Sequence, residues 1–125
     1  MVKKNGVDKA PAYQWYPKDY DSDELVKLMT YEEQGIYRKL LDHQWLEGSI
    51  PANVDHLAGL LGLRGPDAVR FASVMWPRIA VKFHGRGARL TNSRMERERE
   101  KRMEFIHTKA LNGKRGALKR WKKRR

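Results

Sequence analysis

The chain has 125 residues, of which 40% are hydrophobic and none is cysteine, and its net charge at pH 7 is +12. This length and composition predict one domain with one packed core, and they exclude a fully disordered chain, a fibrous repeat and a disulfide scaffold. No apolar run approaches the roughly 18 residues that span a bilayer, and the basic N-terminus lacks the apolar segment of a signal peptide. We therefore expect a cytoplasmic protein without a membrane contact.

The positive charge is concentrated near the C-terminus. Residues 1–93 contain 13 basic and 11 acidic residues, a net charge of +2, whereas residues 94–125 contain 14 basic and 4 acidic residues, a net charge of +10. A near-neutral body with a strongly basic end indicates a polyanionic partner, nucleic acid ahead of an anionic membrane. The alternative is a tail that only aids solubility, but such a tail does not need Leu118 and Trp121, which lie inside the charge run.

The first part of the chain is expected to be an arm. Residues 1–12 are polar and contain glycine and proline, so we expect them to be disordered. The four aromatic residues from Tyr13 to Tyr20, around Pro17, are expected to form an extended arm packed on the core, since they would be a liability on a free arm. A turn or short helix is expected over Asp23–Met29.

A helix is predicted over Tyr31–Glu47. Thr30 and Glu33 have the spacing of a capping box, in which two side chains satisfy two unpaired amide groups of the first turn. Apolar residues then recur at helical spacing. Gly48 suits the left-handed position that ends a helix.

A short strand, two helices and a hairpin are predicted next. Ser49-Ile50-Pro51 indicates the strand, Asn53 is expected to cap the next helix, and Gly62 to Gly65 to hold the turn. The third helix is predicted over Pro66–Met75, ended by Pro77, and burying Val69, Ala72 and either Met75 or Trp76. Apolar and polar residues then alternate over Ile79–His84 and over Arg89–Thr91, around Gly85-Arg86-Gly87, which predicts a two-stranded hairpin.

This order predicts a fold that is mainly α with a small β-hairpin (α+β). Two helices joined by a tight turn make a helix-turn-helix, and a hairpin after the second makes a winged helix. We expect a winged helix-turn-helix domain over residues 13–92, a long charged helix over 93–111 and a basic tail over 112–125. Ser93 and Glu96 are expected to cap the long helix. Asn112-Gly113 and Gly116 are expected to interrupt it or fray it, so that the tail is unfolded until it docks.

Four motifs carry a resemblance to a known family. "WYPKDY", "LMTYEEQGIYRKLLDHQWLEGSIP", "LAGLLGL" and "RLTNSRMERE", from about Trp15 to Glu100, resemble the YdaU-type prophage domain. That domain is found at the N-terminus of phage replication initiator or replisome-organiser proteins. The resemblance implies a winged-helix fold and DNA binding at a phage or prophage replication origin. Many longer relatives carry a C-terminal region suited to contact a helicase or its loader, where this chain has its basic tail.

Three groups of residues are candidates for contact with nucleic acid. Arg86 at the hairpin tip and the polar face of the hairpin would meet phosphates. The third helix offers few base-reading side chains, so strong sequence-specific reading is not expected, and Phe71, if exposed, would indicate a protein interface. The tail could neutralise several phosphates, and Trp121 could stack on an unpaired base or pack on a partner helix. The candidates are Arg64, Arg70, Arg78, Lys82, His84, Arg86, Arg89, Lys109, Lys114, Arg115, Lys119, Arg120, Trp121, Lys122 and Lys123.

No catalytic chemistry is indicated. The four histidines lack metal-ligand spacing, and no nucleophile–base pair can be argued, so we expect no enzyme, no metal and no cofactor. Three functions stay open. The first is a nucleoid-associated protein that binds duplex, or single-stranded, DNA in the initiation of phage or mobile-element replication, with other replication proteins as partners. The second is a winged-helix transcriptional regulator. The third is a homodimeric adaptor, paired through residues 93–111, whose tail binds nucleic acid non-specifically.

Overall fold

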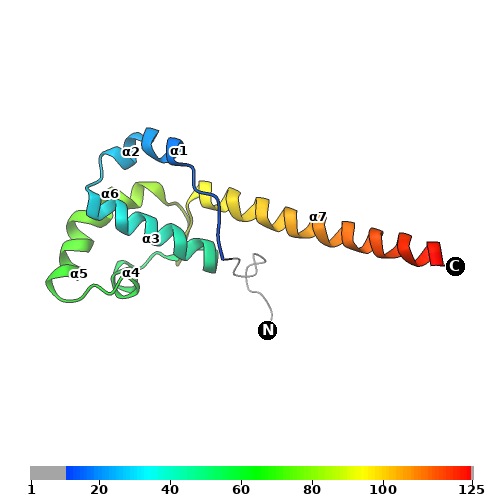
Figure 1. Ribbon diagram of the computed structural model, residues 1–125. Helices are drawn as coiled ribbons and strands as arrows, with labels where there is room; N and C mark the ends of the chain where they lie inside the picture. The colour runs from blue at the N-terminus through cyan, green and yellow to red at the C-terminus, as the bar shows by residue number, and fades with distance from the viewer. Residues whose placement is uncertain (1–10, 125) are drawn as a thin grey trace.

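A small helical body carries one long helix that projects alone from it (Figure 1). The computed structural model describes residues 11–124, so most of the segment expected to be disordered lies outside the described residues. The helices are α1 (Pro17–Ser22), α2 (Glu24–Lys27), α3 (Tyr31–Glu47), α4 (Val54–Leu60), α5 (Pro66–Arg70), the π-helical η1 (Phe71–Met75), α6 (Trp76–Ile79), the 3-10 helix η2 (Ala80–Lys82) and α7 (Ser93–Arg124), and the strands are β1 (Ile50–Pro51) and β2 (Arg89–Leu90). The mainly α class with a small β component is confirmed.

The central helix α3 has the predicted bounds and caps. The Thr30 hydroxyl accepts a hydrogen bond from the Glu33 backbone N–H at 3.1 Å, and the Glu33 carboxylate accepts one from the Thr30 N–H at 2.8 Å. Gly48 ends the helix with a φ of 96°, a conformation that glycine adopts without strain. The helix presents Leu40 and Trp45 to one hydrophobic cluster, which takes in buried side chains from α2, β1, α4, η1, α6 and the start of α7.

The aromatic arm packs on the core as expected, but it is extended only as far as Tyr16. The Tyr13 ring lies 5.2 Å from that of Trp45, and the Trp15 ring lies 4.8 Å from that of Tyr20. Helix α1 begins at Pro17, whose missing N–H costs nothing in a first turn. The arm therefore becomes helical at Pro17, where an extended arm was expected.

The third predicted helix extends beyond its predicted end. Helical structure runs from Pro66 to Lys82, through α5, η1, α6 and η2, and Pro77 does not end it. The Trp76 N–H reaches back to the Phe71 carbonyl in a π turn, and Pro77 follows in the first turn of α6, where it needs no donor. Met75 and Trp76 are buried as expected.

One expectation about the side chains of this helix is wrong, that for Val69, and another is met only in part, because Ala72 is half-buried. Val69 is 66% exposed, whereas Phe71 is fully buried. The core-facing side of the helix is therefore set by Phe71 rather than Val69. Phe71 cannot be part of a protein interface.

The predicted hairpin is largely wrong. Ile79 and Lys82 lie in helical turns, and the two predicted strands meet only at the bridge between His84 and Thr91. The strand β2 pairs instead with β1, antiparallel, with Ile50 opposite Leu90. Ile79 and Phe83 alternate with polar neighbours, but they are also four residues apart, a spacing that fits a helix equally well.

Helix α7 is continuous to Arg124, so the predicted interruption at Asn112-Gly113 and Gly116 is wrong. A glycine inside a helix costs about 1 kcal/mol relative to alanine, which weakens a helix without breaking it. The predicted cap is also wrong, because Asn92 rather than Ser93 accepts the hydrogen bond from the Met95 N–H, at 3.0 Å. At 1.5 Å per residue, the helix is about 48 Å long.

Candidate nucleic-acid interface

Two arginines of the third helix are held by carboxylates of the body. Arg70 donates two hydrogen bonds to Glu32, at 2.9 and 3.0 Å. Arg78 lies 3.2 Å from the carboxylate of Glu33, which is itself buried at the start of α3. Both arginines were candidates for contact with DNA, but much of their charge is neutralised within the chain.

Lys82 has a third internal partner. Its ammonium forms an ion pair with Asp23, and both side chains are mostly buried. Burial disfavours a charged Asp23, but the hydrogen bond and charge of Lys82, together with the N–H groups of Val26 and Leu25, outweigh it and lower the pKa of Asp23. Lys82 therefore belongs to the body's own structure and does not lie on a hairpin face.

The residues of the expected wing divide into two kinds. His84 lies 2.8 Å from the Ser93 hydroxyl, and Arg89 donates to the hydroxyl and carbonyl oxygens of Ser49 at 2.9 and 3.1 Å. Arg86 has an exposed side chain, with no ion pair among residues 11–123. Arg64, just before α5, is exposed in the same way. These two arginines are the body cations best placed to meet a phosphate.

The outer half of α7 gathers the remaining candidates on one element. No acidic residue follows Glu104, and Trp121 is 53% exposed. Figure 1 shows this part of the helix running away from the body, so it meets solvent on all sides. Its exposed basic side chains are Lys109, Lys114, Arg115, Lys119, Arg120, Lys122 and Lys123.

The start of α7 is anchored to the body by Asn92, a role that the sequence analysis missed. Asn92 is 4% exposed, and its side-chain amide donates to the Tyr37 hydroxyl at 3.2 Å and to the Lys82 carbonyl at 2.8 Å. Its backbone exchanges two hydrogen bonds with the Gln44 side chain, at 3.1 and 2.7 Å. In the sequence, Asn92 was marked only by its place in the motif "RLTNSRMERE", which says nothing of the residues that it contacts.

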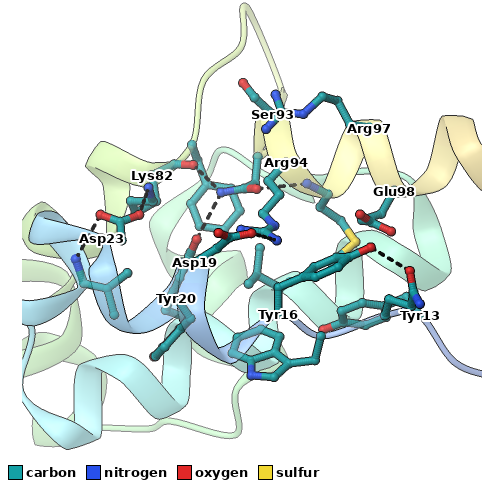
Figure 2. A pocket seen from close by; sticks show the side chains of 18 of the residues that line it. Tyr13, Tyr16, Asp19, Tyr20, Asp23, Lys82, Ser93, Arg94, Arg97 and Glu98 are labelled. Atoms are coloured by element: carbon teal, nitrogen blue, oxygen red, sulfur yellow. Dashed lines mark hydrogen bonds and ion pairs between the residues drawn. The ribbon is translucent and has the colours of Figure 1, made fainter.

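The aromatic arm forms a second anchor for α7 across a cleft of about 310 Å³. Figure 2 shows Arg94 reaching from the helix to Asp19, and the two groups lie 2.7 Å apart. The Arg94 guanidinium also lies 4.8 Å from the centre of the Tyr16 ring. Two motifs far apart in the sequence, "WYPKDY" and "RLTNSRMERE", therefore meet here and fix the direction in which α7 leaves the body.

A third anchor lies one turn further along α7. A side chain added at Gly48, the end of α3, would come within 2.6 Å of the Arg99 guanidinium. Burial lowers the pKa of Arg99, and the nearby charge of Glu47 opposes this shift. A cation at the C-terminus of α3 is also favoured by the helix dipole.

The comparisons identify the family. A family model described as "Protein of unknown function (DUF1376)" matches residues 11–100, well over half of the chain. The chain belongs to the DUF1376 family. No curated protein and no solved structure matches it significantly. The DUF1376 match takes in the body and the anchored start of α7, whereas the basic outer half of the helix lies beyond it.

Neither a membrane-spanning helix nor a cluster of metal ligands is found in the part of the chain that the structure describes. None of the helices in residues 11–124 combines the length and the apolar character that crossing a bilayer requires. Within the described part of the chain, no three His, Asp or Glu side chains lie close enough together to hold a metal ion.

Proposed function

We propose that this protein binds duplex DNA through the outer half of α7, and that the body is a platform that holds this helix, a reduced winged helix in which β1, β2 and the His84–Thr91 bridge take the place of the wing. The observation that carries the proposal is a single projecting helix with seven exposed cations from Lys109 to Lys123 and no acidic side chain. An α-helix fits the major groove of B-DNA, and its cations would lie beside phosphates on both walls. The partly paired cations of the body would add little.

The proposed binding is driven by counterion release and is largely independent of sequence. Each phosphate contact changes the slope of log affinity against log salt by about −0.9. With about six contacts, affinity falls about a thousandfold between 50 and 200 mM salt. The third helix supports this view, because its exposed face carries Val69 and Val74 and an Arg70 already paired with Glu32, rather than free base-reading groups. This argues against a promoter-specific regulator.

We propose initiation of phage or mobile-element replication as the biological setting. The support is the resemblance of "WYPKDY" and "RLTNSRMERE" to the YdaU-type prophage domain, whose members are replication initiator or replisome-organiser proteins. In this setting the chain would supply non-specific DNA affinity to a replication assembly. Selective binding of origin repeats over random duplex would instead require a base-reading surface in the body.

The test compares two fourfold variants that lose the same amount of positive charge, one in the outer half of α7 and one in the body. Their affinity for a labelled duplex is measured by fluorescence anisotropy across a salt series. We expect the α7 variant to flatten the salt slope by about 3 to 4, and the body variant to change it by less than about 1. Equal effects of the two variants, or an unchanged slope for the α7 variant, would refute the proposal. The α7 variant is K114Q/R115Q/K119Q/R120Q, and the body variant is R64Q/R70Q/R86Q/R89Q.

A single-stranded probe of the same sequence separates two uses of α7. If phosphate contacts along a duplex dominate, Trp121→Ala leaves duplex affinity nearly unchanged. Stacking on an unpaired base would instead make Trp121→Ala weaken single-strand binding by about 1–3 kcal/mol. A single strand bound more tightly than the duplex would replace duplex DNA with single-stranded DNA as the ligand.

A further inference from the structure

The face formed by α2 and the start of α3 exposes large apolar side chains. Leu28 is 73% exposed, Tyr31 is 91% exposed and Leu25 is 43% exposed. Tyr31 lines an open groove of about 590 Å³ together with Asp21 and Lys27, and Leu25 and Leu28 are sequence neighbours of its lining residues Val26 and Met29. We call this surface the α2 groove. Apolar groups gathered at a groove are typical of a surface that another chain covers.

The segment that forms the α2 groove is rich in carboxylates. Residues 19–33 contain six acidic residues and one basic residue, a net charge of −5. Four of the six carboxylates are paired within the chain, with Arg94, Lys82, Arg70 and Arg78. The other two are exposed and have no ion-pair partner in residues 11–123: Asp21, which lines the groove, and Glu24, which begins α2. This face therefore offers two free carboxylates, against the single cation Lys27, beside apolar groups.

The outer half of α7 has the complementary character. Leu118 is 52% exposed and Trp121 is 53% exposed, and Leu111, seven residues before Leu118, lies on the same side of the helix. Lys114 and Lys122 lie four residues to either side of Leu118, so cations flank the apolar side chains. This is an apolar stripe bordered by positive charge, which fits an apolar groove bordered by negative charge.

Helix α7 cannot satisfy this complementarity within its own chain. It is continuous from Ser93 to Arg124, and Figure 1 shows it leaving the body and carrying its outer half away from α2. We propose that the outer half of α7 docks in the α2 groove of a second copy of this chain. A reciprocal pair of such contacts would close a symmetric dimer.

This self-association goes beyond the proposed function and does not rest on it. Because the same side of α7 would meet either the groove or DNA, the two partners would compete. Reversing the two free carboxylates of the groove would abolish self-association and leave the DNA-binding helix untouched. The two proposals can therefore fail independently.

Sedimentation velocity of the full chain without nucleic acid tests the proposal, at about 100 µM protein, where a contact of micromolar Kd is nearly saturated. We expect an associated species at about 0.05 M salt and dissociation at about 1 M salt, where the screening length falls to about 3 Å. The groove variant D21K/E24K and the helix variant K114E/K122E should each associate at least about tenfold more weakly. The fourfold variant that combines them exchanges the charges and should associate again.

The control variant D55K/D67K makes the same change in net charge on exposed carboxylates away from the groove, and it should associate like the wild type. A wild-type chain that stays monomeric at low salt overturns the proposal. So does a groove variant that associates as tightly as the wild type, or a fourfold variant that stays monomeric. Circular dichroism of each variant checks that the fold is kept.

Discussion

Asn92 joins the body to α7, so its replacement by alanine tests how the long helix is held. Its side-chain oxygen caps the helix at the Met95 N–H, 3.0 Å away. Its side-chain amide donates to the Tyr37 hydroxyl and to the Lys82 carbonyl, at 3.2 and 2.8 Å. Asn92→Ala removes all three contacts, while the backbone contacts with Gln44 can remain.

The expected loss of stability follows from these contacts. Loss of a helix cap costs about 1 kcal/mol. A buried polar group left without its partner costs about 1–3 kcal/mol, and the Lys82 carbonyl is the group most affected. We therefore expect Asn92→Ala to lower the free energy of unfolding by about 3 kcal/mol, a large part of the stability of a small domain.

Urea unfolding followed by tryptophan fluorescence measures this loss, since Trp45 and Trp76 are buried in the core. The control is Ser93→Ala, because Ser93 is exposed and is the residue that the sequence alone suggested as the cap. Its replacement should cost less than about 0.5 kcal/mol. A cost below about 1 kcal/mol for Asn92→Ala, or equal costs for the two variants, would refute the reasoning.

Three further predictions concern α7 and the ion pairs of the body. Gly113→Ala should raise helicity by circular dichroism and stabilise α7 by up to about 1 kcal/mol, and a loss of helicity would contradict a continuous helix. Gly48→Ala should instead destabilise the fold, because φ at that position is 96° and the new side chain would meet Arg99. Because the pKa of Asp23 is lowered in the folded protein, its charge stabilises the fold at pH values above the ordinary pKa of about 3.9, and this stabilisation is lost as the pH falls through the folded pKa. Asp23→Asn should therefore have a lower Tm than the wild type at neutral pH and approach the wild-type Tm below about pH 4, and a difference in Tm that stays constant with pH would exclude this. Arg70→Ala should leave duplex affinity within about twofold, because its side chain is already paired, and a large loss would return the third helix to the DNA interface.

The sequence predicted best what is decided by nearby residues. The bounds of α3 follow from Thr30, Glu33 and Gly48, whose effects act within a single turn. The cap of α4 at Asn53 is equally local and is also confirmed. The region around Ile79 could not be assigned in this way, because the spacing of its apolar residues fits both the helical and the strand period. Only packing in the core decides between a helix and a strand there.

The candidate site was only partly predictable, for an electrostatic reason. The sequence shows how many cations the chain has, but it does not show which of them form an ion pair with a carboxylate from another element. Arg70 and Arg78 looked free along the chain, yet both have partners at the start of α3, 38 and 45 residues away. The cations of the outer half of α7 are exposed, and no acidic residue follows Glu104 on that part of the helix, so their place as candidates depends less on the fold.

The continuity of α7 changes what the basic residues can do. A flexible tail would lose backbone entropy, about 1–2 kcal/mol per residue, whenever it ordered on a partner. A helix already formed and held at its base by Asn92, Arg94 and Arg99 avoids most of this loss, and it presents its cations in a fixed arrangement. The anchors in the body should therefore raise the affinity of the outer half of α7 for DNA, although they do not contact that part of the helix. Weakening the anchor with Asn92→Ala should lower duplex affinity without removing a single positive charge, and should leave the salt slope nearly unchanged because the same phosphates are met.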